Sequence, residues 1–477
     1  MVVVVLSLLL ALGGSSCSNS PRTNHTLAVL KSRERHVFVI SVDGLGAELL
    51  ARELQKGHLP NLARLRSEGS YAEGVTGTYP SLTAPGHATI VTGKLPAQHG
   101  IYANCRCPVS GEKTRVWSSE DIRVPTMWDA ARQAHLTSAA ISWPLAGGAP
   151  INWNLTGLLS SANGDEVELR RLAKWATPGM IEEVVYGLGQ VVLGGGDDAI
   201  RTRVAIYVIK KYRPNLLLLH LDDLDHAGHR YGPASPETAD TLERIDAYIG
   251  DLLATIRESG LENTTDVFVV SDHGMMSYNI EIQPNVLLAQ AGLITVNEHG
   301  KIIGGKIRTV ANDGSFFLCW PESENLKASV DAALHPLREQ GLVQAVLERD
   351  DLAKLGADPD AQMALEAPPG AIFESHARGA LIHRLKATRG AHGYLPSRPG
   401  VQAVFIAAGP GITAGVNLHQ IQMTAICPTV LKALGIDDSQ FGVRLAIFVP
   451  GCCSDNRRIW SGMGTGGVNP RSTQAKN

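Results

Sequence analysis

Short apolar runs recur along the chain, and each ends in polar or glycine residues. The runs are near-continuous rather than alternating, which is typical of strands buried on both faces of a parallel sheet. Segments with a 3.6-residue apolar period lie between them and predict helices. The predicted strands are 36–44, 136–144, 215–223, 266–274 and 401–411, and the predicted helices are 47–56, 60–69, 124–135, 197–212 and 236–259. This alternation predicts an α/β fold, with a doubly wound, mostly parallel sheet and helices on both faces.

The alternation stops between residues 281 and 380. We interpret three segments there as a hairpin, an amphipathic helix and an irregular crossing: EHGKIIGGKIRTV (298–310), SVDAALHPLREQG (329–341) and EAPPGAIF (366–373). We therefore expect a smaller α+β insertion over 281–380, beside the active-site edge of a core formed by 36–280 and 381–448. The Gly- and Ser-rich segment 449–477 is expected to be a flexible tail.

The first residues, MVVVVLSLLLALGGSSCSNS, form an apolar run of about a dozen residues followed by small ones. The run is too short to span a bilayer and resembles the core of a secretory signal, although a basic segment before it is missing. We interpret residues 1–24 as a signal-like segment and expect an exported protein, periplasmic or extracellular. Cys17 is a candidate lipid acceptor that would attach the N-terminus to a membrane. After export, Cys105 or Cys107 could pair with a distant cysteine.

The charge of the chain is balanced, with a net charge of -3 at pH 7. No basic stripe and no Lys/Arg run occurs, so the sequence gives no reason to expect a nucleic-acid binding surface. Recognition of a phosphate group would have to be local.

Chemistry-bearing residues gather at the predicted strand ends, where open α/β sheets bind their ligands. These residues are Asp43, the DDLDHAGH segment (222–229), Asp272 with His273, and His392 just before the last predicted strand. Aspartate and histidine are the ligand set that suits zinc or manganese, and their spread over four strand ends indicates a binuclear metal site.

Within DDLDHAGH, Asp225 and His229 are four residues apart and are predicted to point at one metal. Asp222, Asp223 and His226 are then expected to be neighbours that orient these ligands or face solvent.

Thr83 precedes Ala-Pro-Gly and an apolar helical run, which would place it at a helix N-terminus where backbone N–H groups can meet an anion. Taken alone, Thr83 is better explained as a helix cap. His87, in the same segment, is expected to lie beside the site rather than to bind metal, and Ser41 and Ser271 are expected to pack inside strands.

Six motifs occur in order along the chain: VDG at Asp43, PSLTAPGH at Thr83, HGIYAN at Asn104, DHAGHRYGP at Asp225 and His229, SDHGM at Asp272 and His273, and GAHGYLP at His392. By these motifs the chain resembles the alkaline phosphatase superfamily and, within it, is similar to the nucleotide pyrophosphatase/phosphodiesterase family. The resemblance covers residues 36–280 and about 380–445.

The resemblance implies two divalent metal ions, with zinc as the first expectation. One would be held by Asp225, His229 and His392, and the other by Asp43, Asp272 and His273 with Thr83 alongside. It also implies that Thr83 is the nucleophile of a phospho-threonine mechanism and that Asn104 hydrogen-bonds a phosphoryl oxygen. The expected activity is hydrolysis of a phosphodiester or nucleotide pyrophosphate bond in a small-molecule substrate.

Alternatives remain open within this resemblance. A phosphomonoesterase of the alkaline phosphatase type is one, because TAPGH also occurs around the nucleophile of threonine-type enzymes; against it, ISWPLAGGAPINW (141–153) lacks the cations that would hold a monoester. Ala84 stands where nucleotide-specific relatives often have Phe, so diester chemistry is better supported than a nucleotide substrate. A sulfatase is disfavoured, because Tyr394 occupies the position of the modified cysteine. A non-hydrolytic metal-binding module and a mutase-like isomerase rank lower still.

Overall fold

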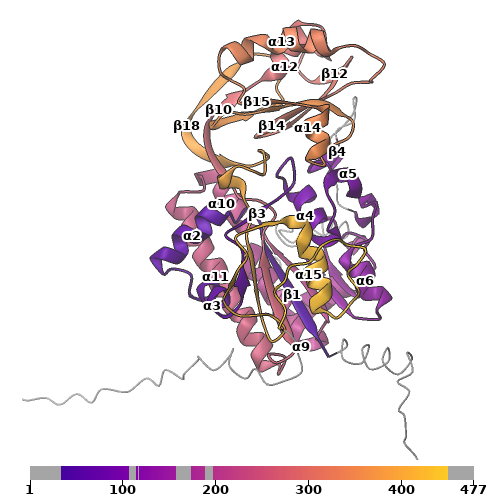
Figure 1. Ribbon diagram of the computed structural model, residues 1–477, viewed down its shortest axis with the longest axis vertical. Helices are drawn as coiled ribbons and strands as arrows, with labels where there is room; N and C mark the ends of the chain where they lie inside the picture. The colour runs from indigo at the N-terminus through magenta and orange to yellow at the C-terminus, as the bar shows by residue number, and fades with distance from the viewer. Residues whose placement is uncertain (1–33, 107–113, 116–117, 157–172, 189–196, 450–477) are drawn as a thin grey trace, which may run out of the picture.

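The computed structural model describes residues 34–106, 114–115, 118–156, 173–188 and 197–449 (Figure 1). The signal-like segment 1–24, Cys107 and the expected tail beyond residue 449 lie outside the described residues. None of the described helices combines the length and the apolar character that a bilayer crossing requires.

An eight-stranded sheet forms the centre of the larger, lower lobe in Figure 1, with strand order β20-β2-β19-β9-β1-β8-β6-β7. The pairs of β1 with β8 and β9, and of β6 with β7 and β8, are parallel, whereas β19 runs antiparallel to β9. The bounds are β1 His36–Val42, β2 Ser70–Tyr71, β6 Ser138–Ile141, β7 Trp153–Leu155, β8 Leu216–Leu221, β9 Thr265–Val270, β19 Phe405–Ala408 and β20 Val416–Asn417. The predicted mostly parallel sheet is therefore confirmed.

Helices cover both faces of this sheet because the strand residues alternate between two cores. Phe38, Ile40 and Val42 of β1 pack in one core with α2, α3, α8, α9 and α11, and Val37 and Val39 pack in the other with α4, α6 and α15. The bounds are α2 Ala47–Lys56, α3 Pro60–Glu68, α4 Thr83–Thr92, α5 Pro96–His99, α6 Met127–Gln133, α8 Met180–Leu188, α9 Asp197–Tyr212, α10 Asp223–Tyr231, α11 Pro236–Glu258 and α15 Ile426–Ala433. The doubly wound arrangement is confirmed.

A second lobe, at the top of Figure 1, is built from residues of β10 to β18. It contains β10 Met276–Ile282, β11 Ile294–Val296, β12 Ile302–Gly305, β13 Arg308–Asn312, β14 Ser315–Cys319, β15 Ala345–Glu348, β16 Ala361–Glu366, β17 Gly370–Phe373, β18 Ile382–Ala391, α12 Pro284–Gln290, α13 Lys327–Glu339 and α14 Arg349–Lys354. The two connections to the larger lobe run through β10 and β18, which pair antiparallel with each other. The expected boundary at 280/281 falls inside β10, and that at 380/381 lies just before β18.

Of the three local predictions in this lobe, one is confirmed and two are wrong. The amphipathic helix over 329–341 is confirmed by α13. The hairpin over 298–310 is wrong in its pairing, because β12 pairs with the preceding β11 and β13 pairs with the following β14. The turn that closes the first pair is fixed by Asn297, whose Oδ1 accepts from the backbone N–H groups of His299 and Lys301. The prediction of an irregular crossing over 366–373 is also wrong, because this segment contains the end of β16 and all of β17.

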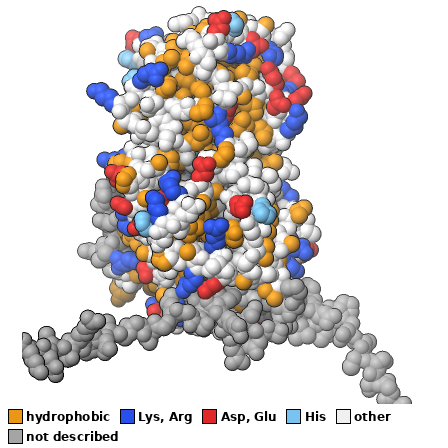
Figure 2. Space-filling model, turned by 60° about the vertical axis from the view of Figure 1, so that its left-hand side comes forward, with side chains coloured by type: hydrophobic (Ala, Val, Ile, Leu, Met, Phe, Trp, Pro, Cys, Tyr) orange, Lys and Arg blue, Asp and Glu red, His pale blue; other side chains and the backbone are white. Residues whose placement is uncertain are grey.

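The surface shows no large area of one charge on the face drawn in Figure 2, where basic and acidic side chains are interspersed over both lobes. This distribution agrees with the near-neutral net charge of the chain.

Candidate active site

One edge of the central sheet brings the predicted metal ligands together. Asp43 follows β1, Asp272 and His273 follow β9, and Asp225 and His229 lie on α10, which begins directly after β8. His392 follows β18, outside the sheet. It precedes β19, and because β19 runs antiparallel to β9, the start of β19 lies at the edge where its parallel neighbours end. The chain therefore reaches a single edge from four separate segments.

Three of these side chains, Asp43, Asp272 and His273, form what we call the Asp43 cluster, and all three are buried. The His273 Nε2 atom lies 3.1 Å from Asp272 Oδ2 and 3.5 Å from Asp43 Oδ1. The hydroxyl of Thr83 lies 3.4 Å from the same Nε2 atom. The four residues predicted to surround one metal are therefore adjacent.

The other three, Asp225, His229 and His392, form what we call the Asp225 cluster. The His229 Nε2 atom lies 3.4 Å from Asp225 Oδ2 and 3.1 Å from His392 Nε2, and His392 Nε2 lies 3.9 Å from Asp225 Oδ1. The His273 and His392 rings stack with centroids 3.8 Å apart, so the two clusters are in contact.

The protons of the three histidines can be assigned from their carbonyl partners. The Nδ1 atom of His229 lies 2.9 Å from the Gly390 carbonyl, that of His392 lies 2.9 Å from the Ser81 carbonyl, and that of His273 lies 3.1 Å from the Gly274 carbonyl. A carbonyl can only accept, so each Nδ1 must carry the proton and each neutral ring keeps a lone pair on Nε2. When both rings are neutral, the Nε2 atoms of His229 and His392 therefore face each other at 3.1 Å as two lone pairs.

One carboxylate oxygen of each aspartate in the two clusters is also unsatisfied. Asp43 Oδ1, Asp225 Oδ1 and Asp272 Oδ2 are buried without a hydrogen-bond partner among the described residues. Burial raises the pKa of Asp272 to about 8, and the neighbouring Asp225 carboxylate adds to this rise. Burial likewise lowers the pKa of the His273 ring to about 3. Converging acceptors with no donors are costly unless a cation lies among them.

The ligand atoms of the two clusters suit zinc. Ligand atoms placed about 2.0–2.2 Å from a tetrahedral zinc ion lie roughly 3.3–3.6 Å from one another. The histidine-to-aspartate and histidine-to-histidine separations given above range from 3.1 to 3.9 Å, which brackets this spacing. Carboxylate oxygen and neutral imidazole nitrogen are ordinary ligands of zinc.

Thr83 is the first residue of α4, as the sequence predicts, and its side chain is partly exposed. The helix approaches the Asp43 cluster closely, because a Cβ atom on Gly86 would lie 2.8 Å from Asp272 Cβ. Asn104 lies beside the start of α4, where its Oδ1 accepts a 2.8 Å hydrogen bond from the Ala84 N–H. Accepting with Oδ1 reserves the Nδ2 group, the donor end of the amide, for another partner.

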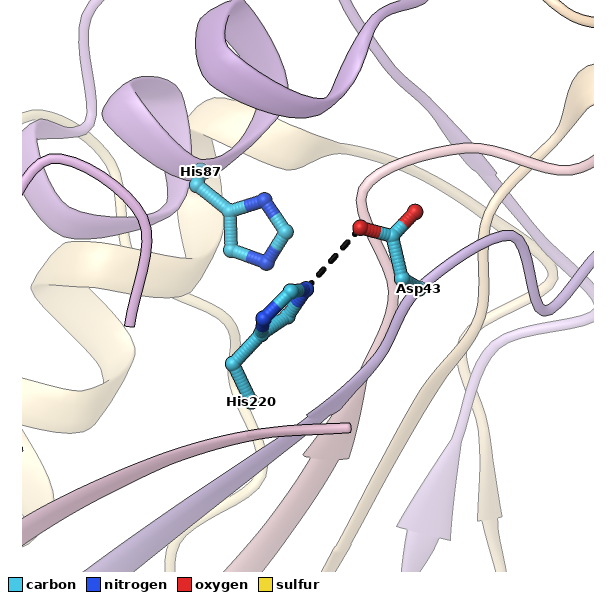
Figure 3. A group of neighbouring side chains, drawn as sticks. All are labelled: Asp43, His87 and His220. Carbon is cyan, nitrogen blue, oxygen red and sulfur yellow. Dashed lines mark hydrogen bonds and ion pairs between the residues drawn. The ribbon is translucent and has the colours of Figure 1, made fainter. Parts of the chain in front are cut away.

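His220, a residue with no role predicted from the sequence, lies against Asp43 (Figure 3). Its Nε2 atom donates a 2.9 Å hydrogen bond to Asp43 Oδ2, and this leaves Oδ1 directed toward His273. The signal in the sequence is a histidine within the apolar run LLLLHL, one residue from the strand end.

His87 lies close enough to Asp43 and His220 for the three to form a further candidate metal group. Both of its nitrogens are already used, however: Nδ1 donates to the Thr83 carbonyl at 2.8 Å, and Nε2 accepts from the Ser41 hydroxyl at 2.9 Å. We therefore assign His87 to holding the first turn of α4 in place. Ser271 is also a packing residue, with its hydroxyl bonded to Leu45 and Val404.

The remaining charges of the DDLDHAGH segment anchor α10. The buried Asp198 carboxylate accepts from the backbone N–H groups of Asp222 and Asp223, at 2.9 and 3.1 Å, where the helix begins. Arg201 is paired with both Asp198 and Asp222. The His226 side chain is 61% exposed, so it faces solvent. This buried ion cluster holds the helix that carries Asp225 and His229.

Comparison with known proteins agrees with this geometry. A family model described as type I phosphodiesterase / nucleotide pyrophosphatase matches residues 37–395. Among curated proteins, the chain is 29% identical over 247 residues to an uncharacterized pyrophosphatase/phosphodiesterase of Schizosaccharomyces pombe, a match that covers 50% of this chain and 44% of the relative. It is 27% identical over 244 residues to human ectonucleotide pyrophosphatase/phosphodiesterase family member 1, covering 50% of this chain and 23% of the relative. The matches thus span less than half the length of these relatives.

Solved structures of similar fold include human ectonucleotide pyrophosphatase/phosphodiesterase 5, with a TM-score of 0.61 and 20% identity, covering 84% of this chain and 95% of that chain. An inactive variant of the murine protein in complex with AMP has a TM-score of 0.61 and 18% identity, covering 85% of this chain and 96% of that chain. At this level of identity the likeness establishes the fold.

Proposed function

Because the chain belongs to the type I phosphodiesterase/nucleotide pyrophosphatase family, we propose that it hydrolyses phosphodiester or pyrophosphate bonds of small-molecule substrates, with Thr83 as the nucleophile. The observation that carries this proposal is the convergence of three lone-pair imidazole nitrogens and three unsatisfied carboxylate oxygens beside the Thr83 hydroxyl. Such a set of acceptors is suited to two divalent cations, and zinc is the cation that the ligand types favour.

The Asp43 cluster with Thr83 would hold one cation, and the Asp225 cluster would hold the other. Divalent cations in these positions supply positive charge that stabilises the charge developing on a phosphoryl group during an in-line displacement. Bound cations would also favour the ionised carboxylate of Asp272, which burial alone disfavours.

The chemistry at Thr83 has two steps. In the first, the Thr83 hydroxyl loses its proton and its oxygen attacks phosphorus; an O–P bond forms, and the bond to the leaving oxygen breaks, so that the leaving group departs with the bonding electron pair and a phospho-threonine remains. In the second, water attacks the same phosphorus and the bond to Thr83 breaks, which restores the hydroxyl. The positive dipole end of α4, which begins at Thr83, would face the phosphoryl oxygens. The Asn104 Nδ2 group, left free to donate because Oδ1 accepts from Ala84, would donate to a non-bridging oxygen.

Two further observations bear on the substrate. The segment ISWPLAGGAPINW contains no basic residue to hold the extra charge of a monoester, which supports a diester. The murine relative was solved as an inactive threonine-to-alanine variant with AMP, which supports both a threonine nucleophile and a nucleotide as a substrate class.

The test is a paired hydrolysis assay of the zinc-loaded protein with bis-p-nitrophenyl phosphate, p-nitrophenyl phosphate and a thymidine 5′-diester. We expect diester hydrolysis to exceed monoester hydrolysis and to disappear in the Thr83→Ala variant. Thr241→Ala, which removes a hydroxyl from α11 outside the site, serves as the matched control and should keep full activity. Full activity in Thr83→Ala, or a monoester rate ten times the diester rate, would contradict the proposal.

We also propose that the protein acts outside the cytoplasm. The support is the apolar core of the signal-like segment 1–24 in the sequence. Cell fractionation combined with N-terminal sequencing of the recovered protein tests this. Full-length protein confined to the cytoplasm would contradict it, and a lipid-modified Cys17 would identify membrane attachment.

A further inference from the structure

The turn between β13 and β14 brings one more carboxylate to the Asp225 cluster. Asp313 occupies this turn, and its carboxylate and one ring nitrogen each of His229 and His392 all lie within 4.8 Å of one another. Both Nδ1 atoms of these histidines are committed to carbonyls, so the nitrogens available to a cation are the Nε2 atoms. A side chain of the second lobe is thus within reach of a cation held by the larger lobe.

The backbone around Asp313 is fixed against Phe373 of β17 and against His392. The Asp313 carbonyl accepts a 2.7 Å hydrogen bond from the Phe373 N–H, and the Gly314 N–H donates to the His392 carbonyl at 2.9 Å. The chain passes so close that a Cβ atom on Gly393 would lie 1.8 Å from the Asn312 carbonyl oxygen, and Gly393 has φ +81°. The position of Asp313 relative to the Asp225 cluster is therefore set by packed backbone rather than by a free loop.

Aspartate is also common in turns, because its short side chain tolerates the left-handed backbone, here at φ +56°. Asparagine and glycine tolerate it equally well, so the turn alone does not call for a negative charge. Independent evidence for a cation comes from the Asp225 cluster, two of whose members, His229 and His392, lie near Asp313. Asp225 Oδ1 is buried without a partner, and the 5% exposed His392 directs its Nε2 lone pair at that of His229.

The charges of the two clusters differ without Asp313. The Asp43 cluster contains two carboxylates, whereas the Asp225 cluster contains one carboxylate and two neutral imidazoles. We propose that Asp313 is an additional carboxylate ligand of the cation in the Asp225 cluster, so that each cluster offers two negative charges to a divalent ion. The inference rests on the proposed two-metal site. The second lobe then forms part of the metal site. Without the β13–β14 turn, the cation in the Asp225 cluster would have three protein ligands.

Metal binding tests the inference apart from activity. The metal-free full chain, prepared with a chelator, is titrated in zinc-buffered solution, and bound zinc is counted by mass spectrometry of the metal. We expect two zinc ions per wild-type chain. In Asp313→Asn, which keeps the shape and the turn preference, filling the second site should need roughly 10–100-fold more free zinc, while the first site stays unchanged. Asp350→Asn, which removes an exposed carboxylate from α14 of the same lobe, is the matched control and should bind zinc as the wild type does.

Cobalt substitution gives a second readout, because the visible absorption of Co²⁺ depends on its ligands. We expect the spectrum of the Asp313→Asn protein to differ from that of the wild type, and that of Asp350→Asn not to differ. If Asp313→Asn fails to fold, Asp313→Gly replaces it, since glycine adopts this backbone without strain. Two zinc ions bound with wild-type affinity and an unchanged cobalt spectrum in the Asp313 variant would overturn the inference. Fewer than two zinc ions on the wild-type chain would instead contradict the proposed function.

Discussion

The hydrogen bond between His220 and Asp43 allows the clearest quantitative prediction. The donor is 6% exposed and the acceptor 4% exposed, so water cannot replace the bond once it is lost. Replacing His220 with Leu keeps an apolar volume but leaves Asp43 Oδ2 without its donor. A hydrogen bond to a charged group contributes about 1.5–3 kcal/mol. If the bond serves mainly to orient Asp43 toward the cation, most of this free energy appears as a roughly 10–100-fold loss of zinc affinity.

The assay is a zinc titration of the metal-free protein together with diester hydrolysis at saturating zinc. His220→Gln, which retains an N–H donor at the end of its side chain, should recover much of the lost affinity. His36→Leu is the matched control, because it removes a buried histidine hydrogen bond to the Pro214 carbonyl at the opposite end of β1. It should lower stability without changing zinc affinity. Equal zinc affinity in His220→Leu and the wild type would refute the reasoning.

Three further outcomes are expected. Thr83→Ala should lower kcat for diester hydrolysis by roughly 10³-fold or more while zinc still protects the protein against heat. In the metal-free protein, burial raises the pKa of Asp272 to about 8, above its value in the unfolded chain. The free energy of unfolding, measured with urea, should therefore fall as pH rises from 6.5 to 8, by up to about 1.4 kcal/mol per pH unit. Zinc should abolish this fall, and a flat profile in the metal-free protein would contradict the reasoning. Arg201→Met should destabilise the protein by about 3–5 kcal/mol, because it leaves the buried Asp198 unpaired, whereas breaking the exposed Lys210–Glu258 pair with Lys210→Ala should cost less than about 1 kcal/mol.

The central sheet was predictable because its strands are buried on both faces and therefore read as continuous apolar runs. Strands β2, β7 and β20 were not predicted, since two or three residues are too few for any period to show. In the second lobe, pairing depends on turns such as those at Asn297 and Asp313, and the apolar pattern carries no information on which strand each turn joins.

The site was predictable as far as its residues stand at strand ends or in the family motifs. Asp43, Asp272 and His273 follow directly from strand position. His220 was missed because a histidine inside an apolar run looks like a core residue until the strand beside it is known to carry Asp43. Asp313 was missed for a different reason: it reaches the site only because the second lobe packs on His392, and no feature of the sequence around ANDGS indicates that contact.

An X-ray structure of the zinc-loaded protein with anomalous data at the zinc edge tests the central claim most directly. We expect two peaks, one among Asp43, Asp272, His273 and Thr83, and the other among Asp225, His229 and His392. A single peak, or a peak between Asp43, His87 and His220, would contradict the assignment of the two clusters as a two-metal site.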